Sequence, residues 1–188
     1  MTTRSAAFAP VEPIRAGLTP VQYAVLGLLH SHPAHGYELQ RRFAAPGDLA
    51  DVVPVEQPTL YAALKDLAAR GLIEGTEVRE GLRPPRTVYA LTVPGDRLLN
   101  AWLRAPVARL RQVRLDFLLK LYFARGRGER AVRALVEAQV QTCEQYLVAL
   151  EARAATLDAD DFAALVAESR TTAARATIEW LRAVLARS

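Results

Sequence analysis

All three histidines of this 188-residue chain fall within six positions, in the segment "LLHSHPAHGYELQ". His30, His32 and His35 are close enough in sequence to supply imidazole ligands to a zinc ion. Such a site needs ligands that converge from a rigid frame, with acidic or thiol groups nearby. Here Pro33 redirects the chain between the second and third histidine, and Glu38 is the only carboxylate close by in sequence. We therefore favour a joint between two helices, with no metal and no other cofactor, over the alternative of a metal site.

A second group of residues that could do chemistry lies in "QPTLYAALKD", residues 57–66. Its leucines recur at helical spacing, and the polar residues between them lie off that apolar stripe. Gln57, Thr59, Tyr61 and Lys65 carry side chains that contact base edges or phosphates when a helix enters the major groove. The alternative is an ordinary solvated helix face, with the Tyr61 ring packed against the preceding helix.

A basic tip follows, between the strand-like segments 72–78 and 87–91. Arg79, Arg83 and Arg86 surround a Gly-Leu-Arg-Pro-Pro turn, and its two prolines hold the tip at low entropic cost. Such a tip can follow a phosphate backbone or enter a minor groove. The alternative is a solubilising hairpin edge, where charge and proline block strand addition.

The net charge of +4 is unevenly placed, because residues 93–127 carry 8 basic and 2 acidic side chains while the first 92 residues are neutral overall. The basic stretch 104–127 has two interpretations. It extends a phosphate footprint, or it pairs with Asp158, Asp160 and Asp161, within or between subunits. We favour pairing, because the stretch lies beyond the two predicted strands.

The C-terminal half contains a set of aromatic residues, and a flat effector could find a pocket there lined by Trp102, Phe117 and Trp180. The alternative is that these side chains are ordinary core or interface anchors. The single cysteine, Cys143, excludes an intrachain disulfide, and we favour core packing for it over a redox role.

Nothing in the sequence points to catalysis, since it has no Gly-rich phosphate loop, no GxSxG turn and no HExxH pair. We therefore expect a chain that is not an enzyme. No apolar run approaches the ~20 residues of a membrane span, and the first 17 residues lack the apolar segment of a secretory signal. These features predict a cytoplasmic protein with a flexible arm at residues 1–17.

The elements that must position these groups follow from helix and strand patterns. A helix begins after Thr19 and ends before Pro33, a second begins near His35 or Gly36, and Pro58 opens a third. Two strands follow the third helix. Three helices and then a two-stranded hairpin is the order of a winged helix-turn-helix, which we place at residues 18–92.

The rest of the chain, residues 93–188, is predicted to be helical. A long helix carries an apolar seam with alternating spacings of four and three, as in a coiled coil, and the last helix carries a similar stripe.

Four segments in order resemble the PadR family of transcriptional regulators, in its subgroup with the longer C-terminal region. They are "LTPVQYAVLGLLHSHPAHGYELQRRF", "PTLYAALKDLAARGLIEG", "RPPRTVYALTVPGDRLLNAWL" and "RLDFLLKLYF". One departure is "TVPGDR", where the family more often has an acidic residue and alanine before the glycine.

The resemblance implies a mainly α fold and a homodimeric repressor that binds double-stranded DNA at an inverted-repeat operator. It also implies that residues 93–188 form an antiparallel helical dimerisation domain, and the residues then predicted at the dimer interface are Val140, Cys143, Leu147, Leu150, Phe162 and Trp180. It also implies possible release by a small aromatic ligand in some members. Together with the residues above, it predicts DNA contacts from Gln57, Thr59, Tyr61, Lys65, Arg79, Arg83, Arg86 and Tyr37. The rival hypothesis is a ligand-sensing or protein-docking module that keeps the fold but binds DNA weakly, which the neutral N-terminal half favours.

Overall fold

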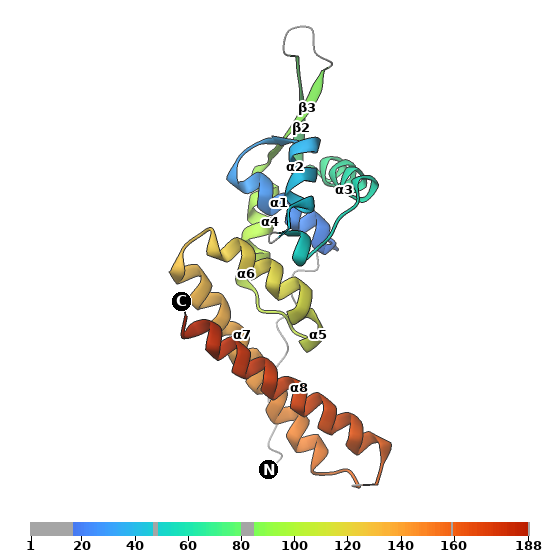
Figure 1. The fold of residues 1–188 in the computed structure, drawn as a ribbon, viewed down its shortest axis with the longest axis vertical. Helices are drawn as coiled ribbons and strands as arrows, with labels where there is room; N and C mark the ends of the chain where they lie inside the picture. The colour runs from blue at the N-terminus through green and yellow to red at the C-terminus, as the bar shows by residue number, and fades with distance from the viewer. Residues whose placement is uncertain (1–16, 47–48, 80–84, 159, 188) are drawn as a thin grey trace, which may run out of the picture.

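The predicted winged-helix order is present in the computed structural model of the chain, which describes residues 17–46, 49–79, 85–158 and 160–187. The β2–β3 wing projects from one end of the molecule, and a long α7–α8 hairpin projects from the other (Figure 1). In chain order the elements are α1 (Pro20–Ser31), β1 (Ala34–His35), α2 (Gly36–Ala44), the 3-10 turn η1 (Leu49–Asp51), α3 (Gln57–Ala69), β2 (Ile73–Val78), β3 (Arg86–Leu91), α4 (Val93–Arg104), α5 (Leu110–Gln112), the π-helical turn η2 (Val113–Phe117), α6 (Leu118–Arg125), α7 (Glu129–Ala154) and α8 (Phe162–Leu185).

Helix α1 begins where the sequence predicted, at a capping box. The Gln22 amide N–H donates to Thr19 Oγ1 at 3.3 Å, and the Thr19 amide N–H donates to Gln22 Oε1 at 2.7 Å. Pro20 occupies the first turn, where its missing N–H costs no hydrogen bond. The helix ends at Ser31, because the residue before Pro33 is excluded from the α region.

The middle of α1 is buried on all sides. Every residue from Gln22 to Leu29 is buried, and the helix contacts α3, α4, α6 and β3. Gly27 is required at its position, because a Cβ there would overlap the ring of Phe123 on α6. Helix α1 is therefore the element on which both the winged helix and the C-terminal helices pack.

The sheet has three antiparallel strands in the order β1-β3-β2, and its β2–β3 hairpin forms the wing. The β2–β3 pair runs from Ile73 opposite Leu91 to Val78 opposite Arg86, and β1 adds His35 opposite Val88. The sequence analysis predicted only two strands. A two-residue strand is too short to show an alternating pattern, so β1 is visible only once β3 lies beside it.

The apolar core of the winged helix continues past the predicted boundary at Thr92. Leu99 and Leu103 of α4 and Leu119 of α6 belong to the same buried cluster as the α1 leucines. A second cluster joins η2, α6, α7 and α8. Among the described helices, none is both long and apolar enough to cross a bilayer.

Helices α7 and α8 form an antiparallel pair within the one chain. Arg182 Nη2 lies 2.7 Å from Glu144 Oε1, and Arg175 Nη2 lies 2.7 Å from Glu151 Oε1, so the two helices run in opposite directions in a single register. The predicted coiled-coil seam thus has a partner in the same chain.

This pairing changes the status of the predicted dimer residues. Val140, Cys143 and Leu150 are buried within the single chain, and Leu147 and Trp180 are partly buried. Phe162 alone of the six is largely exposed, at 79%. Val140, Cys143 and Leu150 therefore have apolar partners within the chain, and a place for them at a dimer interface stays a prediction.

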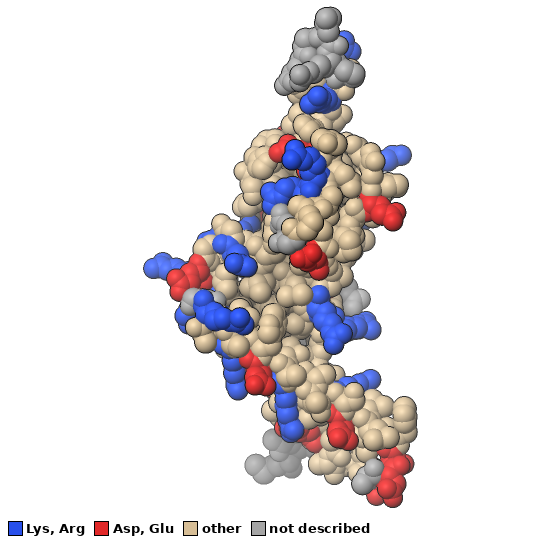
Figure 2. Space-filling model, viewed as in Figure 1, with Lys and Arg blue, Asp and Glu red and all other residues tan. Residues whose placement is uncertain are grey.

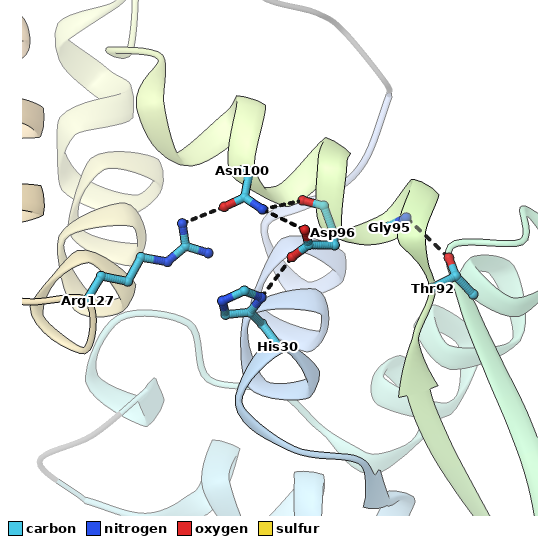
Figure 3. Close-up of polar contacts among 6 residues, drawn as sticks. All are labelled: His30, Thr92, Gly95, Asp96, Asn100 and Arg127. Carbon is cyan, nitrogen blue, oxygen red and sulfur yellow. Dashed lines mark hydrogen bonds and ion pairs between the residues drawn. The ribbon is translucent and has the colours of Figure 1, made fainter.

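A chain of polar contacts joins the winged helix to α4 and to the loop before α7 (Figure 3). His30 Nδ1 lies 2.9 Å from Asp96 Oδ1 in the first turn of α4. The Asn100 side chain donates to Asp96 Oδ2 at 2.9 Å, and Arg127 donates to Asn100 Oδ1 at 2.6 Å. Because Asp96 follows β3 within five residues, these contacts fix the helix that leaves the wing.

Two buried side chains hold the connector between α4 and α5. The amide of Gln139 accepts from the Val107 N–H at 2.7 Å and donates to the Val107 carbonyl at 3.0 Å. Lys120 donates to the Ala105 carbonyl, and its Nζ lies 4.9 Å from the ring centroid of Trp102. Burial lowers the pKa of Lys120 to about 8, and the nearby Asp116 carboxylate opposes that shift.

The burial of Lys120 predicts that the free energy of unfolding rises with pH. Its pKa is about 8 in the folded chain and 10.5 ordinarily, so the unfolded chain binds more protons between these values. The free energy of unfolding is therefore expected to rise across this window, by at most ~1.4 kcal/mol per pH unit. Urea unfolding across the window measures it. Lys120→Met should flatten the rise, and equal slopes for the two proteins would contradict the assignment.

Candidate nucleic-acid interface

A groove of 680 Å³ lies between the start of α2, the first turns of α3 and the outer part of β3. Ten residues line it: His35, Gly36, Tyr37, Glu38, Arg41, Tyr61, Pro85, Arg86, Thr87 and Tyr89. They come from three elements that are far apart in sequence. The groove therefore exists only because β3 lies beside β1 and α3 crosses α2.

The N-terminus of α2 opens into this groove. His35 is its N-cap, and His35 Nδ1 accepts a hydrogen bond from the Glu38 amide at 3.2 Å. The imidazole also stacks on the Tyr37 ring, with the centroids 6.3 Å apart. The first amide groups of the helix and its positive dipole end thus face the groove, an arrangement that favours an anion.

The three histidines have three different partners. His35 caps α2, His30 contacts Asp96, and His32 Nε2 lies 3.1 Å from a Glu38 carboxylate oxygen. Within the described ranges, no three His, Cys, Asp or Glu side chains gather as a metal-binding group. The cluster in sequence is therefore spread over three separate contacts in space.

Gly36 allows the Tyr61 ring to approach the α2 backbone. A Cβ at Gly36 would lie 2.8 Å from the Tyr61 hydroxyl, which is shorter than any ordinary contact. Tyr61 nevertheless remains 43% exposed, and Tyr37 is 67% exposed. The Tyr61 ring thus packs on α2 and also lines the groove, while its contact with DNA stays a prediction.

The basic side chains of the groove are not neutralised by neighbours. Among the residues that the structure describes, Arg41 and Arg86 in the groove and Lys65 on α3 have no ion pair or hydrogen bond. By contrast, Arg70 pairs with Asp66 at 3.3 Å. The uncompensated charges therefore lie around the groove and on the exposed face of α3.

The predicted contact residues fall into three groups. Tyr37, Tyr61 and Arg86 line the groove, whereas Gln57, Thr59 and Lys65 are exposed on α3. Arg79 is exposed on the wing and lies 3.4 Å from Glu77. Arg83 lies outside the described residues.

The sequence analysis missed Arg41 and Thr87, which complete the groove. Arg41 lies one helical turn after Tyr37, so spacing on the same face could have identified it. Thr87 could not have been found this way, because its position depends on the pairing of β3 with β1.

The three predicted effector residues make separate packing contacts in the described part of the chain. Trp102 stacks on Tyr23 at 4.2 Å between ring centroids, and Phe117 is fully buried with its ring 6.0 Å from Trp180. Burial also raises the pKa of the Cys143 thiol, which suits a packing role. A different cavity, of 400 Å³, lies at the junction of the winged helix and the C-terminal helices, with Arg42, Tyr122 and Arg127 in its wall.

Two known protein families match separate parts of this chain. Residues 25–101 match the family described as transcriptional regulator PadR-like family, and residues 113–187 match the one described as virulence activator alpha C-term. The negative transcriptional regulator PadR of Bacillus subtilis (strain 168) is 27% identical over 121 residues, which cover 64% of this chain and 65% of that relative.

Two crystal structures of Bacillus subtilis PadR are each 23% identical to this chain. The complex with operator DNA has a TM-score of 0.46 and covers 90% of this chain and 99% of that one. The complex with p-coumaric acid has a TM-score of 0.42 and covers 90% and 98%. At these scores the two structures carry no argument about individual residues of this chain.

The groove predicts a sequence-independent affinity for duplex DNA. Arg41→Ala with Arg86→Ala is expected to weaken binding to a random duplex, since two charges that meet phosphates are lost. The slope of log affinity against log salt concentration should fall by about 1 for each lost contact. Fluorescence anisotropy at several salt concentrations measures both quantities.

The matched control is Arg125→Ala with Arg130→Ala, which removes two exposed arginines that lie outside the groove. It should leave the salt slope unchanged. An equal loss in both double variants would show that overall charge, and not the groove, governs binding.

Proposed function

We propose that this chain, which belongs to the PadR-like family of transcriptional regulators, binds operator DNA through its winged helix and represses transcription. The observation that carries the proposal is the groove in which the α2 N-terminus, Arg41 and Arg86 converge beside the exposed polar face of α3. Phosphate contacts from the groove position the protein, and α3 reads base edges.

Each element has a separate role in this proposal. Helix α3 enters the major groove with Gln57 and Thr59 in its first turn, where a recognition helix contacts bases. Gln57 has the side chain that pairs with adenine, and Lys65 meets phosphate further along the helix. The wing carries Arg79 to the neighbouring backbone. Tyr37 and Tyr61 bring hydroxyl groups to the phosphates at the mouth of the groove.

We propose that the protein acts as a homodimer on the two halves of an inverted repeat. One winged helix covers a single half-site, and two copies related by a two-fold axis read a palindrome. The C-terminal helices supply the contact between copies. A repressor is supported by the relative named a negative transcriptional regulator, and that name describes the relative alone.

The junction cavity is our proposed effector site. It is bordered by α1, α2, α4 and α6, and its wall holds Arg42, Arg127 and the Tyr122 hydroxyl. Two guanidinium groups beside apolar residues suit a small aromatic carboxylate. His30 and Arg127 border the cavity, and they are also the two ends of the chain of polar contacts that runs through Asp96. A ligand in the cavity would therefore act on α4, the helix that follows the wing.

Operator recognition is tested with intergenic DNA upstream of the protein's own gene, in mobility-shift assays with a random duplex as competitor. Lys65→Ala is expected to weaken binding to both DNAs severalfold, since it removes a phosphate contact. Thr59→Ala should lower the preference for the operator, because it removes a contact to a base edge. The groove double variant should lower both affinities and leave their ratio unchanged.

Absence of binding to any nearby intergenic DNA at low salt would overturn the proposed function. The remaining interpretation would then be a docking or ligand-sensing module that keeps the winged-helix fold.

The effector proposal predicts that p-coumarate weakens operator binding. Arg127→Ala is expected to raise the p-coumarate concentration needed by about tenfold, because a charge-assisted hydrogen bond is lost. Arg130→Ala is the control, as this exposed arginine does not line the cavity. An equal response in both variants would remove the cavity from the proposal, and no release by p-coumarate would exclude this ligand.

A further inference from the structure

A hollow of 580 Å³ lies between α8 and the segment formed by α5, η2 and the start of α6, and we name it the α8 hollow. Its volume is in the range of small-molecule sites. None of its lining residues belongs to the groove or to the junction cavity. Nine residues line it: Leu110, Arg111, Val113, Arg114, Leu118, Ala173, Ala176, Thr177 and Trp180.

One face of α8 forms the floor of the hollow. Ala173, Ala176 and Trp180 follow one another at helical spacing, so the floor runs about 10 Å along the helix axis. The two alanines are exposed, and the half-buried Trp180 has its ring 6.0 Å from the buried ring of Phe117. The Thr177 hydroxyl donates to the Ala173 carbonyl at 2.8 Å, within its own helix. A narrow, mostly apolar floor of this length suits an extended alkyl chain.

The opposite wall of the hollow is aliphatic and comes from an irregular part of the chain. Leu110, Val113 and Leu118 supply it from α5, from η2 and from the start of α6. The turn η2 is π-helical, a rare conformation that is found frequently at functional sites. The connector that leads into α5 is fixed by the buried Gln139 amide, which bonds both backbone polar groups of Val107. The wall is therefore held in place from the core side.

Two cations accompany this apolar lining. Arg111 and Arg114 are exposed, and among the residues that the structure describes neither has an ion pair or a hydrogen bond. The sequence analysis favoured pairing of this basic stretch with Asp158, Asp160 and Asp161, but no ion pair joins these groups within the described part of one chain. Figure 2 shows basic side chains beside α5 and acidic side chains at the free end of the α7–α8 hairpin. Two uncompensated guanidinium groups beside apolar surface favour an anion with an apolar body.

We propose that the α8 hollow is a second ligand site, which binds an aliphatic carboxylate of medium chain length. The alkyl chain lies along the floor from Ala173 to Trp180, and its removal from water against the aliphatic wall drives binding. Arg111 and Arg114 hold the carboxylate, because the guanidinium fork matches the two carboxylate oxygens. The site goes beyond the proposed function, since it involves neither DNA nor the junction cavity.

Decanoate, below its micelle concentration, is the probe for this site in the full chain. Trp102→Phe leaves Trp180 as the only tryptophan, and decanoate is expected to change its fluorescence in a saturable way. Decan-1-ol, which carries no charge, should bind about tenfold or more weakly, because the charge-assisted hydrogen bonds are not formed. Arg111→Ala with Arg114→Ala should weaken decanoate binding by a similar factor and leave decanol binding unchanged.

The matched control for charge is Arg130→Ala with Arg153→Ala, which removes two exposed arginines that do not line the hollow. This control should bind decanoate like the unaltered chain. Equal losses of affinity in the two double variants would show that overall charge governs binding, and would overturn the assignment of the carboxylate to Arg111 and Arg114.

A second variant tests the hollow without changing its charge. Ala176→Trp places an indole on the floor at an exposed helix position, so the fold should be kept, and saturable decanoate binding should be lost. Ala134→Trp, at an exposed position on α7, should bind decanoate normally. Arg127→Ala should also leave decanoate affinity unchanged, because Arg127 lines the junction cavity and not the hollow. Circular dichroism checks the helix content of each variant.

Two results would overturn the ligand site. One is the absence of a saturable response to decanoate in the unaltered chain, or an undiminished response in Ala176→Trp. The other is a change of oligomeric state in Ala176→Trp, measured by sedimentation velocity, in a chain that does not bind decanoate, since the hollow would then contact another chain instead. The titrations contain no DNA, so a failure of the proposed operator binding would leave their outcome unchanged.

Discussion

The burial of α1 is the constraint on which the rest of the molecule depends. Eight consecutive residues of this helix have no solvent-facing side, so it cannot be the surface helix of an isolated winged helix. Its outer side must be covered, and α4 and α6 cover it. Gly27 makes the contact close enough for the Phe123 ring to lie on the backbone. The winged helix and the C-terminal helices are therefore parts of one packed body, with no free linker between them.

The placement of ion pairs explains how the N-terminal half can have no net charge and still contain a positive groove. Asp66 is held by Arg70 and by the Gln22 amide at 2.6 Å, Glu38 by His32, and Glu77 by Arg79. The arginine partners neutralise Asp66 and Glu77, whereas Asp51, Glu56 and Glu74 have no ion pair among the described residues. Arg41, Lys65 and Arg86 lack such partners among the described residues, so a chain segment with no net charge presents a positive groove. Total charge is a poor guide here because affinity for DNA depends on local potential.

At the junction, a chain of hydrogen bonds links the wall of the cavity to the start of α4, the helix that follows the wing. Arg127 and His30 border the cavity, and they meet the two ends of a hydrogen-bonded chain through Asn100 and Asp96. Thr92, at the end of the wing, caps α4 and donates to the Gly71 carbonyl at 2.8 Å, where α3 ends and β2 is about to begin. The start of α4 is thus joined by hydrogen bonds to the end of α3, to the wing and to the wall of the cavity.

The sequence by itself determined the helices, the two long strands and their order, because capping residues, prolines and apolar spacing act locally. Thr19, Pro20 and Pro33 bound α1, and Gln57, Thr59 and Lys65 were assigned correctly to an exposed face of α3. The tertiary structure alone decided which faces found partners. It paired β1 with β3, placed Arg41 and Thr87 in one groove, and packed α8 against the apolar seam of α7. A helical stripe shows that a face must be buried, but any apolar surface of matching shape can bury it. That choice depends on contacts between residues distant in sequence, which periodicity does not record.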